Sequence, residues 1–205
     1  EARYAIAAGA DALGLVAQMP TGPGPIADSL IREIARCVPP PTATFLLTSR
    51  DTPSGVVEHV RATGVNTVQL VDDSAGEDIW RSLRLEFPAV RIVQVIHIRG
   101  EASVEHALAA APHVDALLLD SGNPLARELG GTGRIHDWAV SRRIVERASV
   151  PVSLAGGLNP TNVGEAIRTV RPFGIDLCSG VRSNGALSVR KLTDLVSAMR
   201  RADER

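Results

Sequence analysis

Seven short apolar runs recur along the chain, each rich in Val, Ile, Leu or Ala. They lack a clean alternation of apolar and polar side chains, which is typical of parallel strands that are covered on both faces. The pattern therefore predicts buried strands at residues 12–17, 43–48, 66–71, 91–96, 115–120, 150–155 and 174–179.

Segments with helical spacing fill the intervals, and the starts of successive strands lie 23 to 35 residues apart. Residues 1–8 already have helical spacing, ahead of the first predicted strand. Asp28 or Ser29 is positioned to cap the helix after that strand, and Asp137 is positioned to cap a later one. The chain therefore repeats a βα unit.

Strands that alternate with helices are typical of two architectures, the closed (βα)8 barrel and the open doubly wound sheet. The open sheet is expected to carry a glycine-rich dinucleotide loop, and no G-x-G-x-x-G motif follows a predicted strand. We therefore expect an α/β fold in which residues 1–205 form a single (βα)8 TIM-barrel domain. Because such a barrel closes with eight strands, we expect its first strand and the following loop, roughly ten to fifteen residues, to precede Glu1.

Composition excludes several classes of function. The 205 residues include 22 Lys and Arg and 23 Asp and Glu, a net charge of −1, and neither sign is concentrated in one stretch. Binding to nucleic acid or to an anionic membrane is therefore not expected. No apolar run reaches the roughly 18 residues of a membrane-spanning helix. We expect a soluble protein for which small neutral or anionic ligands remain open, and nothing in the sequence bears on its oligomeric state.

Two cysteines, Cys37 and Cys178, are too few for a disulfide scaffold or for a cysteine-based zinc site. No set of His, Asp and Glu residues has the spacing of metal ligands, so no metal is expected. The chain shows no signal-peptide pattern, and the cytoplasm is the expected compartment.

Two glycine-containing loops follow the last two predicted strands. In (βα)8 barrels the active site lies at the carboxyl ends of the strands, and the corresponding loops form a recurrent phosphate site. Glycines allow backbone N–H groups to converge on an anion, and a helix expected to begin at Asn159 and Pro160 would add its positive dipole end. The alternative is that the glycines only permit tight βα turns. The expected phosphate-binding residues are Gly156, Gly157, Asn159, Ser179, Gly180 and Val181.

Asp120 ends the apolar run 115–120 and precedes an unusually long loop, residues 121–134. Burial at the end of an apolar strand raises the pKa of a carboxyl group towards a value suited to general acid catalysis. Asp120 is therefore a candidate acid, and the alternative is that it caps a local turn at Ser121. The long loop is a candidate lid, and its Gly131 and Gly133 are added to the expected binding residues.

Several other polar residues have two interpretations. His97, at the end of a strand, is a candidate substrate ligand or base, although a single histidine there is more often a hydrogen-bonded structural residue. Cys178 is expected to be a small buried hydrophobic residue rather than a thiolate nucleophile. The histidines expected to be solvated, on outer helices or at their ends, are His59, His106 and His113.

The sequence resembles the phosphoribosylanthranilate isomerase family over essentially its entire length. The resemblance implies a (βα)8 barrel and a cofactor-free Amadori rearrangement in tryptophan biosynthesis, which converts N-(5'-phosphoribosyl)anthranilate to its 1-deoxyribulose ketone. The motifs that carry it are GADALGL at 9–15, NTVQL at 66–70, LLLDS at 117–121, GGTGRIHDW at 130–138, AGGLNPTNV at 155–163 and RPFGIDLCSGV at 171–181.

The resemblance also implies catalytic roles. The general acid of the family, which protonates the furanose oxygen, is an aspartate that corresponds to Asp120. The base of the family, which takes a proton from C2' of the Schiff base, is a cysteine in a K-x-C-G motif on the first barrel strand. Neither Cys37 nor Cys178 occupies that position.

Three segments depart from the family pattern. An S-P-R element, whose arginine faces the anthranilate carboxylate, is replaced by residues 18–26, which contain no cation. The family's Q-L-H-G becomes QLVD at 69–72, and its K-A becomes QVIH at 94–97. Arg134 and Arg182 are candidate replacements for the missing cation. The departures leave two alternatives to the isomerase: a divergent paralogue that acts on another phosphorylated sugar, or a non-catalytic homologue that binds a phosphorylated ligand.

Overall fold

The computed structural model of the chain describes residues 1–19, 24–72, 75–121 and 136–203. Seven parallel strands form one sheet, and their order in the sheet is their order in the chain. They are β1 Ala12–Val16, β2 Ala43–Thr48, β3 Thr67–Leu70, β4 Arg91–His97, β5 Ala116–Asp120, β6 Val152–Leu154 and β7 Gly174–Ile175. A short antiparallel hairpin follows, made of β8 Arg182–Ser183 and β9 Ala186–Leu187.

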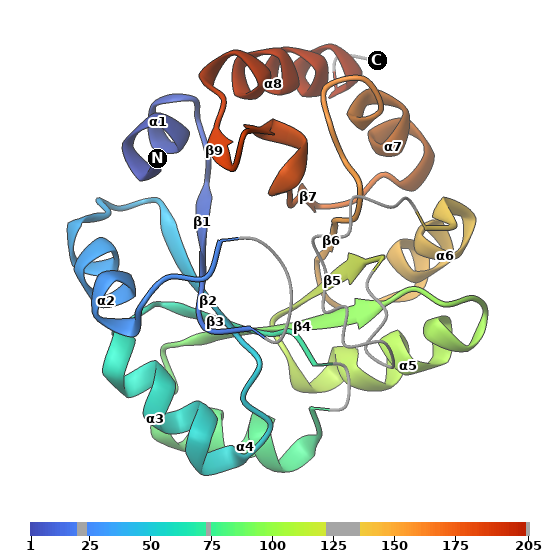
Figure 1. Cartoon of the computed structure of the whole chain (residues 1–205). Helices are drawn as coiled ribbons and strands as arrows, with labels where there is room; N and C mark the ends of the chain where they lie inside the picture. Colours follow the sequence, from blue (N-terminus) through green and yellow to red (C-terminus); the bar gives the residue numbers. More distant parts are fainter. Residues whose placement is uncertain (20–23, 73–74, 122–135, 204–205) are drawn as a thin grey trace.

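Helices connect successive strands and form an outer ring around the sheet (Figure 1). None of those in the described ranges is long and apolar enough to cross a membrane. The helices are α1 Ala2–Ala7, α2 Asp28–Cys37, α3 Pro53–Thr63, α4 Glu77–Glu86, α5 Ala102–Ala110, α6 Trp138–Arg147, α7 Val163–Val170 and α8 Val189–Asp203, with 3-10 turns η1 Ala111–His113 and η3 Ser179–Val181.

The seven predicted strands are confirmed in position and order. The apolar run 174–179 is a strand only in its first part, because pairing with β6 ends at Ile175 and residues 179–181 turn into η3. The outward face of the sheet packs on the helices through a large apolar cluster that includes Ile96 and Leu119. A smaller cluster that includes Val95 and Leu118 lines the inside of the barrel.

The predicted cap of α6 is confirmed, because Asp137 Oδ1 accepts a hydrogen bond from the Ala139 N–H at 2.9 Å. The predicted cap of α2 by Asp28 or Ser29 is wrong. Both residues lie inside the helix, and the N-cap residue is Ala27, whose side chain makes no capping hydrogen bond.

His59 is buried, so the prediction of a solvated histidine is wrong. The α3 face that carries it packs towards β2 and α2, where both ring nitrogens find partners. Nδ1 lies 2.9 Å from Thr48 Oγ1, and Nε2 lies 3.1 Å from Asp28 Oδ1. Burial lowers the pKa of His59 below its usual value, although the hydrogen bond and charge of Asp28 oppose the shift. His106 and His113 are exposed, as expected.

We expect the free energy of unfolding to decrease as the pH falls below about 6.5. The unfolded chain protonates at His59 in this range, whereas the folded protein, with its lowered pKa, resists protonation. His59→Gln should therefore flatten the dependence below pH 6.5 in denaturant titrations. The matched control is His106→Gln at an exposed site, which should keep the original slope. An unchanged slope in His59→Gln would contradict the prediction.

Candidate active site

Polar side chains gather on the inner face of the barrel where the strands end. Val93 and Val95 of β4 and Leu118 of β5 belong to the inner apolar cluster. Because successive side chains of a strand alternate between its faces, His97 and Asp120, each two residues further on, also face the interior. The two residues are register partners in the sheet.

Asp120 lies at the mouth of the barrel and is 9% exposed. Its Oδ1 accepts a hydrogen bond from the Ser121 backbone N–H at 2.6 Å, as the turn-capping interpretation requires. Its charge also acts on Asp176 and His136, whose pKa values it raises. Asp120 is therefore part of a titratable cluster in addition to holding its local turn, and its role as an acid stays a prediction.

Asp176 is a candidate that the sequence analysis missed. Its backbone N–H donates to the Leu154 carbonyl at 2.9 Å, which fixes Asp176 directly after β7. The loss of hydration among the surrounding protein atoms, together with the charge of Asp120, raises the pKa of Asp176 to about 6, against a hydrogen bond from the Leu177 backbone. The Asp176 residue is nevertheless exposed to solvent at the mouth, so water screens much of this effect, and the direction of the shift is what the charge of Asp120 supports. The sequence signal that could have identified Asp176 was its position inside the motif RPFGIDLCSGV at 171–181.

The charge of Asp120 favours the protonated form of Asp176, because a second negative charge beside the first is unfavourable. Asp176 takes up a proton as the pH falls towards about 6, while Asp120 lies within its electrostatic reach. The mouth of the barrel can therefore hold a protonated acid and a carboxylate at the same time. Proton transfer to and from a bound molecule requires these two forms.

His136 adds a neutral ring to the cluster. Its Nε2 lies 2.7 Å from Ser141 Oγ at the start of α6. Burial lowers the pKa of His136, while the charges of Asp120 and Asp137 oppose the shift. The ring is therefore uncharged at neutral pH.

The loops after β6 and β7 are in close contact at their glycines. Gly156 and Gly157 have φ angles of 85° and 63°, in the left-handed region that glycine adopts without strain. A Cβ atom on Gly156 would lie 3.0 Å from the Ser121 backbone nitrogen, and one on Gly180 would lie 1.9 Å from the Leu158 carbonyl oxygen. The glycines therefore allow both loops and the end of β5 to meet at one place.

Asn159 supports its loop from within. Its backbone N–H donates to Asn162 Oδ1 at 2.8 Å, and the side-chain amides of both asparagines donate to the Gly157 carbonyl, at 3.3 and 2.9 Å. The prediction that a helix begins at Asn159 is wrong, because this hydrogen-bonded turn comes first and α7 begins at Val163. Asn159 therefore orients the Gly157 peptide, and its backbone N–H is already engaged.

The remaining predicted binding residues lie in or near η3. Ser179 is exposed, whereas the Val181 side chain is buried in an apolar cluster with Val163 and Leu192. Gly131, Gly133 and Arg134 lie outside the described residues.

Arg182 is engaged by a carboxylate of this chain. Its guanidinium nitrogens lie 3.1 and 2.8 Å from the two carboxylate oxygens of Glu1, and Nη1 also donates to the Gly185 carbonyl at 2.7 Å. Cys178 is half-buried. A role for Arg182 in holding a substrate carboxylate stays a prediction.

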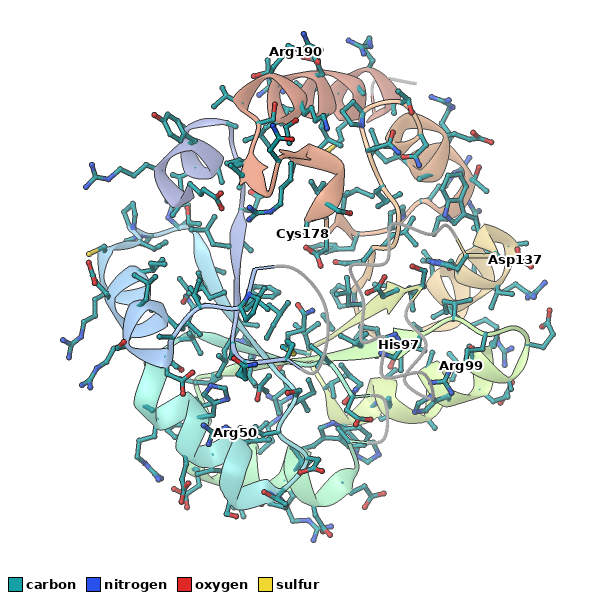
Figure 2. All side chains as sticks on the ribbon, in the orientation of Figure 1. Arg50, His97, Arg99, Asp137, Cys178 and Arg190 are labelled. Carbon is teal, nitrogen blue, oxygen red and sulfur yellow. The ribbon has the colours of Figure 1, made fainter. Side chains whose placement is uncertain are left out.

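The strand ends and the outer layer differ in the side chains that they present. In Figure 2, His97 lies at the end of β4 on the inner side of the helix ring, while Arg50, Asp137 and Arg190 lie in the outer layer.

Among the described residues, no group of three or more His, Cys, Asp or Glu side chains is arranged to hold a metal ion.

A sequence model of the family described as "N-(5'phosphoribosyl)anthranilate (PRA) isomerase" matches residues 40–198. The chain belongs to this family. The N-(5'-phosphoribosyl)anthranilate isomerase 2 of Methanosarcina mazei is 40% identical over 190 residues, which cover 92% of this chain and 84% of that protein. The family predicted from the motifs is therefore confirmed.

Solved structures of the PRA isomerase family have the same fold. The phosphoribosyl anthranilate isomerase of Thermotoga maritima matches with a TM-score of 0.80 at 28% identity, over 97% of this chain and 92% of that one. A PRA isomerase in complex with reduced 1-(o-carboxyphenylamino)-1-deoxyribulose 5-phosphate matches with a TM-score of 0.76 at 25% identity, with the same coverage. These matches confirm the predicted (βα)8-barrel fold class.

Proposed function

We propose that this chain is an N-(5'-phosphoribosyl)anthranilate isomerase of tryptophan biosynthesis and that residues 1–205 act as one barrel domain in the cytoplasm. The observation that carries the proposal is the pair Asp120 and Asp176 at the carboxyl ends of the strands, in a member of the PRA isomerase family. The reaction only moves protons and electron pairs within one substrate. An acid beside a carboxylate suits such a reaction.

The proposed reaction starts with the 5'-phosphate bound at the loops after β6 and β7. Asp120, in its protonated form, donates a proton to the furanose oxygen, the C1'–O bond breaks, and the nitrogen lone pair forms the C1'=N bond of the Schiff base. A base then removes the C2' proton, and the resulting enaminol rearranges to the ketone. Asp176, whose pKa is raised to about 6, supplies the proton that returns Asp120 to its acid form.

One observation favours a second candidate, the same rearrangement of a phosphorylated sugar that lacks a carboxylate. The segment after β1 has no cation, and the Arg182 guanidinium is bound to Glu1. Burying the anthranilate carboxylate without a partner would cost several kcal/mol. For N-(5'-phosphoribosyl)anthranilate to be the substrate, its carboxylate needs a cationic partner. The two candidates are Arg182, where the carboxylate would replace Glu1, and Arg134.

The full-length protein should consume N-(5'-phosphoribosyl)anthranilate, which is followed by the decay of anthranilate fluorescence. Its gene should also restore growth to a tryptophan auxotroph that lacks the isomerase. The Asp120→Asn variant gives the background rate in both assays. The proposal would be contradicted if the protein neither consumed N-(5'-phosphoribosyl)anthranilate nor restored growth to the auxotroph. Turnover of an aminoaldose phosphate that lacks a carboxylate would then establish the second candidate.

A further inference from the structure

One nitrogen of the buried His97 ring has no partner in the part of the chain that the structure describes. We propose that this atom, Nδ1, accepts a hydrogen bond from the hydroxyl group on C2' of the substrate, which makes His97 a substrate-binding residue. The assignment rests on the proposed isomerase function and adds a contact to it. It involves hydrogen bonding alone and no covalent step.

The other ring nitrogen determines the tautomer of His97. Nε2 lies 3.0 Å from the Val71 carbonyl oxygen. A carbonyl oxygen only accepts hydrogen bonds, so Nε2 carries the hydrogen in the neutral ring and Nδ1 carries the lone pair. Nδ1 is therefore an acceptor in need of an N–H or O–H donor.

Burial makes this unpaired acceptor costly. His97 is only 2% exposed, so bulk water does not hydrate Nδ1 freely. A buried acceptor without a donor is destabilising relative to a paired one. The inner neighbours of His97 on the same strand, Val93 and Val95, are apolar. A histidine at this position is explained when a bound molecule supplies the donor.

The sheet places His97 beside the candidate acid. His97 and Asp120 are register partners, and the Ile98 N–H donates to the Asp120 carbonyl at 2.9 Å, so the ends of β4 and β5 are tied together. Neighbouring strands are about 4.8 Å apart. When the ring oxygen of a bound sugar contacts Asp120, a neighbouring polar group of the same sugar therefore lies within reach of His97.

Strand order identifies that group. The proposed phosphate loops follow β6 and β7, Asp120 ends β5, and His97 ends β4. In the substrate, the phosphate is attached through C5' to C4', and C1' and C2' lie on the other side of the ring oxygen. A substrate with its phosphate at β6 and β7 and its ring oxygen at β5 therefore directs C1' and C2' towards β4.

Two donors lie on that side of the substrate, the N–H on C1' and the hydroxyl on C2'. The anthranilate N–H has an acceptor within its own molecule, because the carboxylate is in the ortho position. The C2' hydroxyl has only the neighbouring C3' oxygen as an acceptor, at a poor hydrogen-bond angle, so it is available to donate to His97 Nδ1. This contact orients C2', the carbon from which the proposed reaction removes a proton.

Two substitutions separate substrate binding from a structural role. In His97→Asn, the side-chain oxygen takes the position of Nδ1 and keeps an acceptor for the substrate. In His97→Gln, the side-chain amide takes the position of Nε2 and keeps the hydrogen bond to the Val71 carbonyl. We expect kcat/KM to fall roughly tenfold or more in His97→Gln and by less than about fivefold in His97→Asn. The reverse order, with lower thermal midpoints in His97→Asn, would indicate a structural residue and overturn the assignment.

Calorimetry with two ligands tests the contact directly in the full-length protein. The reduced product analogue carries a hydroxyl at C2', and a second analogue lacks only this group. The unsubstituted protein should bind the second ligand roughly tenfold more weakly, and His97→Gln should bind both alike. Equal affinities in the unsubstituted protein would overturn the assignment without recourse to any variant. Binding of neither ligand would instead overturn the proposed isomerase function, and the assignment with it.

Discussion

Asp120→Asn is expected to lower the turnover of N-(5'-phosphoribosyl)anthranilate by roughly 100-fold or more, with only a modest loss of affinity. Asparagine has nearly the shape of aspartate and still accepts the hydrogen bond from the Ser121 N–H, so the end of β5 should keep its structure. It has no acidic proton to give to the furanose oxygen. Steady-state kinetics by anthranilate fluorescence measure both constants.

A matched control is Asp78→Asn, which makes the same chemical change on an exposed carboxylate of α4. This control should leave turnover and thermal stability unchanged, because surface ion pairs contribute little. Near-normal turnover in Asp120→Asn would contradict the acid role. Asp120 would then be a residue that holds the turn at Ser121 and influences Asp176 only through its charge.

Gly157→Asp is expected to weaken the binding of phosphorylated ligands at least about 100-fold, because it adds a negative charge to the proposed phosphate loop. Two unit charges 4 Å apart interact by about 4 kcal/mol at an effective dielectric constant near 20, and about 1.4 kcal/mol corresponds to a factor of ten. The expected loss is therefore within what charge repulsion supplies.

Gly157→Asn is the matched control for this charge. The φ angle of Gly157, 63°, lies in the left-handed region, which Asn and Asp tolerate better than other side chains. Both variants therefore carry similar backbone strain and differ in charge. Calorimetry with the reduced product analogue and with inorganic phosphate should show strong loss only for the aspartate. Equal affinities of the two variants would mean that the phosphate binds elsewhere.

The hydrophobic pattern by itself was sufficient to locate the strands. A parallel strand that is covered on both faces needs an unbroken apolar run, so its position is visible in the local sequence. The predicted strand at 43–48 coincides with β2. The predicted cap of α6 was also confirmed, because the Asp137 side chain accepts a hydrogen bond from an N–H only two residues away. Contacts of this range are encoded locally, and the sequence motifs were likewise sufficient to identify the family.

Only the tertiary structure decided which polar residues lie together. His59 was expected in solvent, and its partners Thr48 and Asp28 come from β2 and α2. The raised pKa of Asp176 depends on its surroundings and on Asp120, which reaches the mouth from another strand. The acceptor lone pair on His97 follows from one contact with the Val71 carbonyl. Desolvation and charge interactions depend on distances between residues far apart in the chain, and a local pattern of side chains does not contain those distances.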